Sequence, residues 1–173
     1  TEEPQKIPVC ESTMIATDWI NGRRTPDANQ LLKGTIAGFT LGSNAPQVFR
    51  ALVEATAYGT KAIVDRFESE GIVIDNVIGI GGIALKSPFV MQTMCDVINK
   101  PIKVCNTDQA CALGAAMFAA TAAGIYEKVE DAIENMNSGF SKEYIPQPEN
   151  VKAYEDIYKK YLKLGQFTEK ELF

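Results

Sequence analysis

The sequence predicts an α/β fold in which a few strands are covered by several helices. The segment from Val77 to Val104 reads as a strand, a glycine turn, a helix and a second strand, which is the order of a βαβ unit. Elsewhere, apolar residues at helical spacing predict at least four helices. Two strands form a thin sheet for so many helices. We therefore expect further strands of the sheet to lie outside these 173 residues.

The first strand of this unit leads into two glycines. Val77–Ile80 is apolar and mostly β-branched, which predicts a strand covered on both faces. Gly81 and Gly82 follow, and glycine permits a sharp turn with a bare backbone. Such a turn after the first strand of a βαβ unit is a common nucleotide site. The spacing is GxGG rather than GxGxxG, however, and by itself favours a simple tight turn.

The helix of the unit carries start and stop signals. Ser87 and Pro88 are residue types typical of the N-cap and the first helical position. Pro101 is expected to end the helix. Ile102–Val104 then resumes a strand.

The chain before this unit begins with irregular segments. Residues 1–8 contain two prolines and predict a frayed terminus. Residues 9–17 allow a strand, although apolar and polar residues alternate poorly there. Residues 18–27 contain the turn signals Asn-Gly and Pro-Asp, which predict a structured loop.

Two adjacent arginines, Arg23 and Arg24, lie in that loop. They are compatible with phosphate binding, with simple solvation, or with pairing to Asp18 and Asp27. We favour solvation or pairing over phosphate binding, because most surface arginines are solvated or paired.

Residues 44–70 predict one long helix. Ser43 or Asn44 suits its N-cap, and Gly71 suits the C′ position. Apolar residues form two adjacent stripes, so most of the helix is expected to be buried. The stripes are Val48, Leu52, Ala55, Gly59 and Ala62, and beside them Phe49, Val53, Ile63 and Phe67.

Residues 110–125 are rich in alanine and carry no charge. They are too few to span a bilayer, so we expect a helix buried in a protein core. Thr107 or Asp108 suits its N-cap.

The last third of the chain predicts three further elements. Residues 128–135 suggest a short amphipathic helix, residues 141–150 a loop with two prolines, and residues 152–164 a final helix covering the outside.

Composition excludes several classes of function. The net charge is −5 without a basic cluster, so nucleic acid and anionic membranes are poor partners. The sequence contains no histidine, which removes Ser-His-Asp catalysis, imidazole bases and histidine metal ligands. Cys95, Cys105 and Cys111 lie in apolar surroundings without a CxxC pair. We therefore expect buried free thiols and a reducing cytoplasm.

Three runs of sequence stand out: DWINGRRTP at 18–26 with LKG at 32–34, GGIALK at 81–86 with MQ at 91–92, and DQACALGAA at 108–116. These runs resemble the FGGY carbohydrate kinases, and most closely the members that act on L-ribulose. A second family signature, at Gly34–Glu54, departs from the pattern at Phe39 and Leu52. The resemblance continues in register over nearly the whole chain.

This resemblance implies an incomplete ribonuclease H-like, actin-like ATPase domain. Residues 1–173 would form one partial domain, the C-terminal nucleotide-binding domain of a kinase, without its N-terminal domain. The family transfers the γ-phosphate of ATP, with Mg²⁺, to a sugar hydroxyl. The expected product is L-ribulose 5-phosphate, in arabinose breakdown. The catalytic aspartate belongs to the N-terminal domain, so no catalytic residue or metal ligand is expected here, and the piece alone should be inactive.

The resemblance also implies which residues face the nucleotide. Gly81 and Gly82 match glycines of the adenosine motif, where the nucleotide lies against bare backbone. Ser87 matches a position near the adenine where relatives often carry asparagine, which is longer. Gly114 lies in a segment where helices of the two halves meet. ATP or ADP, a pentulose and the missing domain are the expected partners, and a homodimer is compatible with the sequence.

Three alternatives stay open. One is another FGGY kinase, acting on D-ribulose, ribitol or xylulose. A second is an actin- or Hsp70-like ATPase, which would leave the Asp18–Pro26 loop unexplained. A third is a Rossmann-like or flavodoxin-like binding module, which requires more parallel strands than the sequence shows.

Overall fold

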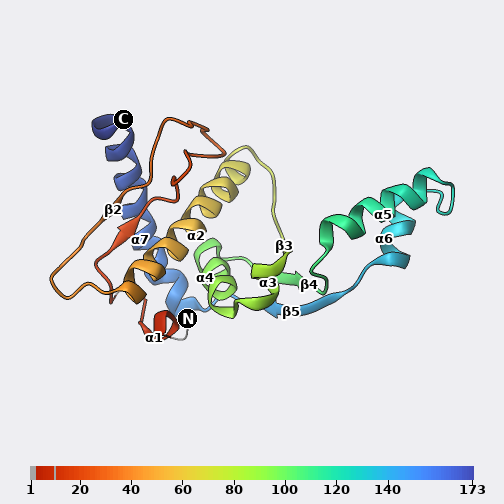
Figure 1. Ribbon diagram of the computed structural model, residues 1–173, viewed down its shortest axis with the longest axis horizontal. Coiled ribbons are helices and arrows are strands. Elements are labelled where there is room, and N and C mark those ends of the chain that lie inside the picture. Colours follow the sequence, from red (N-terminus) through yellow and green to blue (C-terminus); the bar gives the residue numbers. More distant parts are fainter. Residues whose placement is uncertain (1–2, 10) are drawn as a thin grey trace.

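The computed structural model describes residues 3–9 and 11–173. Figure 1 shows a helical body, a small sheet beside it, and an arm that projects from the sheet. In order, the elements are α1 Glu3–Lys6, β1 Ile15–Ala16, β2 Ile36–Ala37, α2 Ala45–Ser69, β3 Val77–Gly79, α3 Gly82–Lys86, α4 Pro88–Ile98, β4 Ile102–Cys105, α5 Ala110–Ala122, α6 Val129–Met136, β5 Phe140–Tyr144, α7 Pro148–Phe167 and a π-helical turn, η1 Thr168–Leu172.

The predicted βαβ unit is confirmed. β3 and β4 are parallel, with Val77 opposite Ile102, and α4 lies between them in the sequence. The sheet has a third strand, β5, which pairs antiparallel with β4. The prediction of a loop over 141–150 was wrong for the residues in β5. Three of these residues are Ser, Lys and Glu, so their polarity concealed an edge strand whose Tyr144 is buried.

One face of the sheet packs against α4. Ile102 and Val104 are each 1% exposed and form a core cluster with Met91, Cys95 and Ile98. The other face is different, because Ile78 and Ile80 are each 58% exposed. The prediction that this strand is covered on both faces was wrong for the part of the chain that the structure describes.

The boundaries of α4 agree in part with the expected signals. Ser87 is the N-cap, because its hydroxyl accepts a hydrogen bond from the Val90 N–H at 3.4 Å. The helix ends at Ile98, where Asn99 adopts a left-handed backbone conformation with φ of 52°. It therefore ends before Pro101, the expected stop.

The long helix α2 is confirmed, including both of its ends. Asn44 accepts from the Gln47 N–H at 3.0 Å, and the Gln47 side chain accepts from the Asn44 N–H at 3.1 Å. Gly71 follows the C-cap with φ of +86°. The predicted pattern of burial was wrong, because Phe49 and Phe67 are exposed. The buried residues of α2 are Arg50, Ala51, Glu54, Ala55, Ala57, Tyr58 and Val64.

The final helix, α7, belongs to the core rather than to an outer cover. Tyr154, Tyr158 and Tyr161 are buried around Tyr58 of α2, with ring centroids 5.4–6.2 Å from that of Tyr58. Tyrosine contributes a large apolar ring to a core while its hydroxyl seeks a partner. The polar residues between them concealed this role in the sequence.

The N-terminal segment is attached to the helical body. Arg50 of α2 donates to the carbonyl oxygens of Pro4 and Ile7. The predicted fraying was therefore wrong for residues 3–8. The same prediction for residues 1–2, and residue 10 of the strand allowed at 9–17, lie outside the described residues. The strand allowed at 9–17 is the short β1, which pairs with β2.

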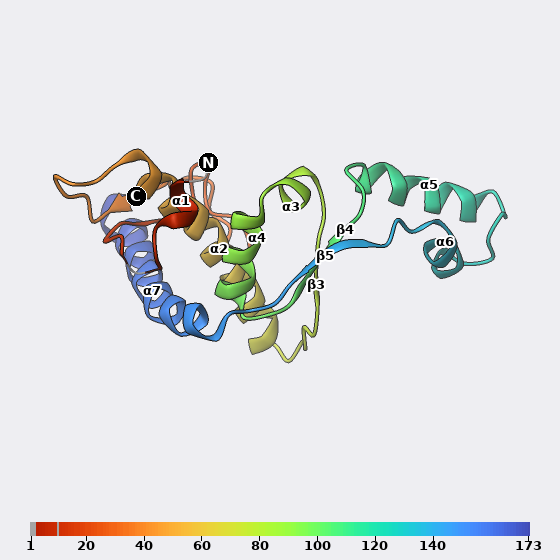
Figure 2. The same cartoon turned by 90° about the horizontal axis from the view of Figure 1, so that it is seen from below.

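The alanine-rich helix forms but is not buried. Figures 1 and 2 show α5 and α6 side by side in the arm, away from the body. Met117 is the one residue of α5 classed as buried, so the prediction of a core helix was wrong here. Its N-cap is Gln109, although Thr107 accepts from the Gln109 N–H at 3.1 Å. Within the described chain, no helix combines the length and apolarity needed to cross a bilayer.

Candidate functional site: the glycine turn and the loop beside it

The candidate site lies where β3 and β4 end. Because the two strands are parallel, the turn after β3 and the loop after β4 leave the same edge of the sheet. The first contains Gly81 and Gly82, and the second leads into α5, which carries Gly114 (Figure 1). Ser87 stands between α3 and α4. The fold thus places two glycine-bearing segments at the carboxyl ends of β3 and β4.

The glycine turn leaves its backbone uncovered. Gly81 has φ of 88° and ψ of 177°, a conformation restricted almost entirely to glycine. A Cβ added at Gly81 or at Gly82 would meet no atom within 4 Å. Packing within the chain therefore does not explain why Gly82 lacks a side chain, and the space beside its backbone is available to a ligand.

A third glycine in the same strand has a structural role. A Cβ at Gly79 would lie 2.9 Å from Cε of Met91 and 3.5 Å from Ile102. Gly79 thus faces the packed side of the sheet. The sequence alone did not distinguish the structural role of Gly79 from the roles expected for Gly81 and Gly82.

The other two predicted residues are placed as follows. The Ser87 hydroxyl caps α4, and it keeps its own proton to donate elsewhere. Gly114 also has open space where a Cβ would stand. No described atom outside α5 itself lies within 4 Å of that point.

No metal centre forms among the described residues. Groups of three or more His, Cys, Asp or Glu side chains that could hold an ion do not occur there. Cys95 is buried, Cys105 is half-buried and Cys111 is exposed, and all three are free. Burial raises the pKa of Cys95 to about 12. The prediction of buried thiols is therefore confirmed for Cys95 and wrong for Cys111.

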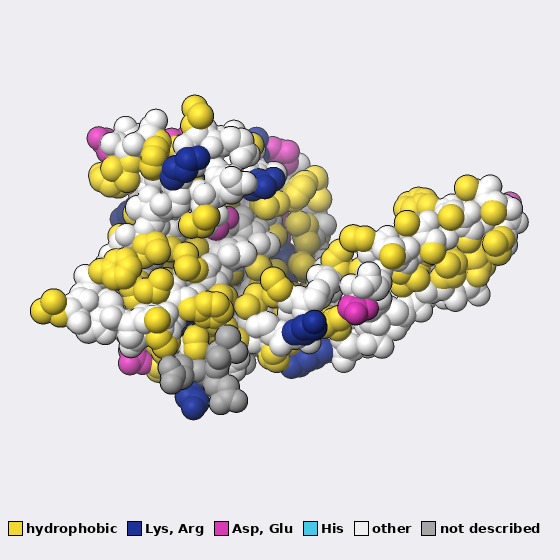
Figure 3. Space-filling view, in the orientation of Figure 1, with side chains coloured by type: hydrophobic (Ala, Val, Ile, Leu, Met, Phe, Trp, Pro, Cys, Tyr) yellow, Lys and Arg dark blue, Asp and Glu magenta, His cyan; other side chains and the backbone are white. Residues whose placement is uncertain are grey.

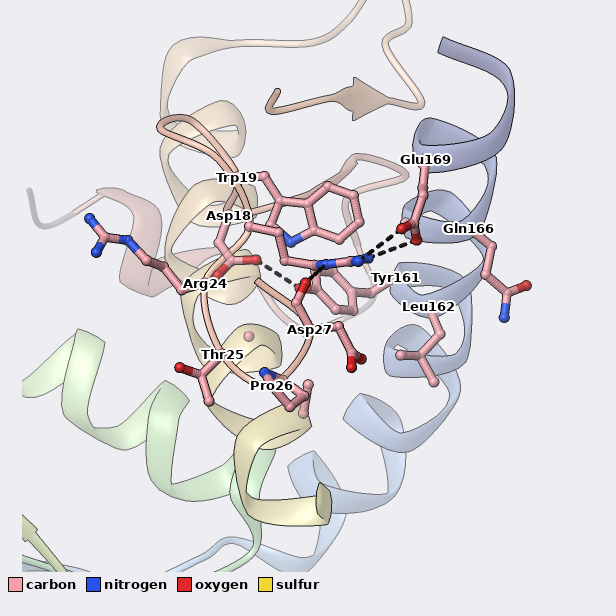
Figure 4. A pocket seen from close by; sticks show the side chains of 14 residues that line it. Asp18, Trp19, Arg24, Thr25, Pro26, Asp27, Tyr161, Leu162, Gln166 and Glu169 are labelled. Atoms are coloured by element: carbon pink, nitrogen blue, oxygen red, sulfur yellow. Dashed lines mark hydrogen bonds and ion pairs between the residues drawn. The ribbon is translucent and has the colours of Figure 1, made fainter. Parts of the chain in front are cut away.

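A hollow lies between the 18–27 loop, α2 and α7, away from the glycine turn. It has a volume of about 260 Å³. Figure 4 shows Trp19, Asp27 and Glu169 around it, with the Arg24 side chain directed away from Glu169. The loop thus packs against two helices that are far apart in the sequence.

Arg23 is fully engaged within this hollow. Its guanidinium donates to both carboxylate oxygens of Glu169, at 2.8 and 2.9 Å, and Nε donates to the Asp27 carbonyl at 2.5 Å. It also lies over the Trp19 ring, 5.1 Å from the centroid. The hydrogen bonds that Arg23 donates to Glu169 raise the pKa of Arg23. Arg23 is therefore paired, as favoured, although its carboxylate partner is neither Asp18 nor Asp27.

Asp18 is held by a different partner. Its carboxylate accepts from the Tyr161 hydroxyl at 2.7 Å and lies close to Gly59, where a Cβ would overlap it. Partial desolvation raises the pKa of Asp18. These contacts account for the loop structurally, and they leave the glycine turn as the stronger candidate for a ligand site.

Comparison with known proteins bears directly on this assignment. Residues 5–123 match the C-terminal domain of the FGGY family of carbohydrate kinases. The chain belongs to this family. The match includes the glycine turn and all of α5.

Curated relatives and solved structures agree with the family. The chain is 51% identical to a ribulokinase of Vibrio parahaemolyticus over 91% of its length, and 39% identical to one of Bacillus licheniformis over 99%. It spans only 28% and 32% of those proteins.

Among solved structures, a ligand-bound xylulose kinase from Lactobacillus acidophilus is similar to the chain with a TM-score of 0.85 and 21% identity. The match covers 98% of this chain and 34% of the xylulose kinase chain. A Plasmodium falciparum glycerol kinase with ADP is similar with a TM-score of 0.71 and 24% identity. That match covers 94% of this chain and 33% of the glycerol kinase chain. The FGGY domain therefore has the ribonuclease H-like, actin-like ATPase fold, with few strands and several helices.

Proposed function

We propose that the chain is the C-terminal, nucleotide-binding part of an ATP-dependent kinase that phosphorylates L-ribulose to L-ribulose 5-phosphate. Ribulokinases are 51% and 39% identical to nearly the whole chain, which supports this choice. Since the chain spans about a third of these relatives, the proposal includes an N-terminal domain that supplies the catalytic aspartate. It also places the enzyme in the cytoplasm.

The observation that carries the proposal is the open backbone at Gly81 and Gly82. In this proposal the adenosine part of ATP or ADP lies against that backbone, where no side chain intervenes. The related glycerol kinase structure contains ADP, which supports a nucleotide in this fold. Ser87 would donate its hydroxyl proton to the nucleotide while it continues to cap α4. Gly114 would allow a helix of the other half to approach α5.

This division of labour suits phosphoryl transfer. The reaction depends mainly on positioning the donor and acceptor and on stabilising charge. The chain contributes a fixed seat for the nucleotide, formed by backbone rather than by titrating side chains. The N-terminal domain would hold the sugar and take the proton from its hydroxyl. Domain closure would then bring the two substrates together.

The residues described here do not provide a set of ligands for Mg²⁺. No cluster of three or more candidate ligands occurs among them. Within the proposal, Mg²⁺ is therefore held mainly by the phosphates of ATP and by the other half, and it neutralises phosphate charge. We assign no Mg²⁺ ligand among the described residues, 3–9 and 11–173.

The decisive experiment compares two glycine substitutions in the complete gene product. In Gly82→Val, an isopropyl group occupies the space proposed for adenosine, so the KM for ATP should rise at least tenfold while the KM for L-ribulose changes little. Gly42→Val is the matched control, because a Cβ at Gly42 meets only Thr40, at 3.9 Å. Equal KM values for ATP in the two variants would contradict the nucleotide site.

The acceptor is tested separately. We expect the highest kcat/KM with L-ribulose in a panel that also contains D-ribulose, ribitol and D-xylulose. A higher value for another acceptor would correct the substrate while leaving the kinase assignment intact. ATP hydrolysis that no sugar stimulates would instead favour an ATPase of the actin or Hsp70 type.

A further inference from the structure

The hollow between the 18–27 loop, α2 and α7 has walls that side chains hold in place. Arg23 of the loop pairs with Glu169 of η1, and Tyr161 of α7 donates to Asp18 of the loop. These contacts join segments 146 and 143 residues apart in the chain. Because its walls are tied together, the hollow of about 260 Å³ is preformed, as most small-molecule sites are.

Several polar groups around this hollow are not used by the chain. Arg24, Thr25 and Gln166 line it (Figure 4), and no described residue forms a hydrogen bond or ion pair with their side chains. Asp27 adds a carboxylate whose ion pair with Arg66 is long, at 3.7 Å. The lining therefore offers both donors and acceptors to a ligand.

Charge at the hollow is close to balanced. Figure 3 shows side chains of both signs over the upper end of the body, where the loop and the ends of α2 and α7 lie in Figure 1. Arg23 and Glu169 neutralise each other, and Asp27 faces Arg66. One carboxylate and one guanidinium of the lining remain, those of Asp18 and Arg24. A phosphate or an organic cation would therefore meet no excess of the opposite charge.

Apolar side chains and a small volume narrow the choice of ligand. Pro26, Ala62 and Leu162 belong to the lining, and the C–H groups of a sugar pack against such side chains. Pockets for drug-sized ligands measure roughly 300–1,000 Å³, so this hollow suits a smaller molecule. Hydroxyl groups both donate and accept hydrogen bonds. A neutral polyhydroxy compound of monosaccharide size thus matches the volume, the charge and the mixed lining.

We propose that this hollow binds one monosaccharide-sized polyol. Thr25, Asp27 and Gln166 form hydrogen bonds with its hydroxyl groups, and Leu162 packs against its C–H groups. The inference goes beyond the proposed function, in which the sugar that reacts is held by the N-terminal domain. It rests on that proposal only for the choice of L-ribulose as the probe.

The first test measures binding stoichiometry by equilibrium dialysis of labelled L-ribulose against the complete gene product without ATP. At saturation the parent should bind two molecules per chain, one as acceptor and one in the hollow. Ala62→Leu fills the hollow and should bind one. Ala153→Leu is the matched control and should bind two, because Ala153 is also half-buried but lines a different hollow.

A substitution at the surface tests the same site without changing its packing. Asp27→Ala removes one acceptor and keeps the backbone carbonyl that Arg23 uses. The affinity for the second molecule should fall about tenfold, as expected for the loss of one hydrogen bond to a charged group. Asp156→Ala is the control, because its carboxylate is similarly exposed, at 77% against 67% for Asp27, and lies outside the hollow. Equal affinities in the two variants would contradict the site.

The outcomes separate the alternatives. One bound molecule in the parent, or two in Ala62→Leu, would overturn the inference. Displacement of the second molecule by an equal concentration of inorganic phosphate or putrescine would also overturn it, because the hollow would then prefer an ion. Kinase activity with a single bound sugar would refute the hollow site alone. A bound sugar that Ala62→Leu removes, in a protein without kinase activity, would refute the proposed function alone.

Discussion

The helical body and the sheet end of this molecule differ in how their polar and apolar side chains are placed. In the body, buried polar groups meet partners: Asp96, 2% exposed, accepts from the side chains of Gln92 and Asn150 and from the Gln147 N–H at 2.8–2.9 Å. At the sheet end, apolar residues such as Ile78 remain exposed. The buried polar groups of the body thus find partners within the chain, whereas the sheet end leaves apolar side chains exposed to solvent.

Glycines show the same difference on a smaller scale. Gly38, after β2, has φ of +85°, and a Cβ there would overlap the backbone carbonyl of Thr13. The Thr13 hydroxyl also donates to the Gly38 carbonyl at 2.7 Å. Gly82 and Gly114 meet nothing within 4 Å. A glycine required by packing is thereby distinguished from one whose surroundings would accommodate a side chain.

The largest expected loss of stability comes from Arg50→Met, which breaks a buried ion pair in the body. Arg50 is 5% exposed and donates to Glu54 at 2.7 Å and to the Tyr154 hydroxyl at 3.1 Å. Its removal leaves a buried carboxylate without its cation, so the free energy of unfolding should fall by about 3–5 kcal/mol. Urea unfolding measures this loss. Arg66→Met on the same helix removes an exposed pair and should leave the free energy of unfolding nearly unchanged, because solvent screens exposed ion pairs.

The pH dependence gives a further check on that variant. Desolvation raises the pKa of Glu54, and the Arg50 charge opposes this rise. A carboxyl whose pKa is higher in the folded state loses stability as pH increases through that range. Arg50→Met should therefore lose stability more steeply than the parent as pH rises above the ordinary pKa of a glutamate, about 4.3. Parallel pH profiles would show that the ion pair does not matter.

The comparison of glycines predicts the next largest effect. Gly38→Ala places a side chain in a left-handed conformation and against the Thr13 backbone, so it should cost about 2–4 kcal/mol. Gly82→Ala meets no atom and should change stability by less than about 0.5 kcal/mol. Thermal unfolding of the two variants measures both losses of stability. Similar losses in both would remove the distinction between packed and open glycines.

The smallest expected effect concerns the surface of the body. Glu169→Gln breaks the pair with Arg23, whose exposed setting limits its value to about 1 kcal/mol. Hydrogen bonds from Arg23 lower the pKa of Glu169. The stabilisation is therefore present above the unfolded pKa of about 4.3 and is lost as pH falls through the lowered value. Denaturant midpoints at pH 7 and pH 3 measure this.

A neighbouring residue serves as the control for this test. Glu171 lies in the same π-helical turn, so Glu171→Gln changes the same charge without breaking the Arg23 pair. It should leave the midpoint unchanged at both pH values. Equal effects of the two variants would assign the loss to net charge rather than to the contact.

Local patterns in the sequence determined the βαβ unit, the caps of α2 and the glycine turn. These features depend on residues close together in the chain: Asn44 caps a helix that starts next to it, and Gly81 adopts a conformation that other residues rarely tolerate. The resemblance to FGGY kinases rests on similarly short runs. Such features are readable without knowing which distant segments meet.

Only the tertiary structure decided which faces are buried and which partners meet. Arg23 finds its carboxylate 146 residues away, and the polar strand β5 joins the sheet because β4 offers it an edge. The apolar helix α5, in contrast, remains exposed although its composition predicts a core. Burial depends on what packs against an element, and spacing within one element carries no information about that partner.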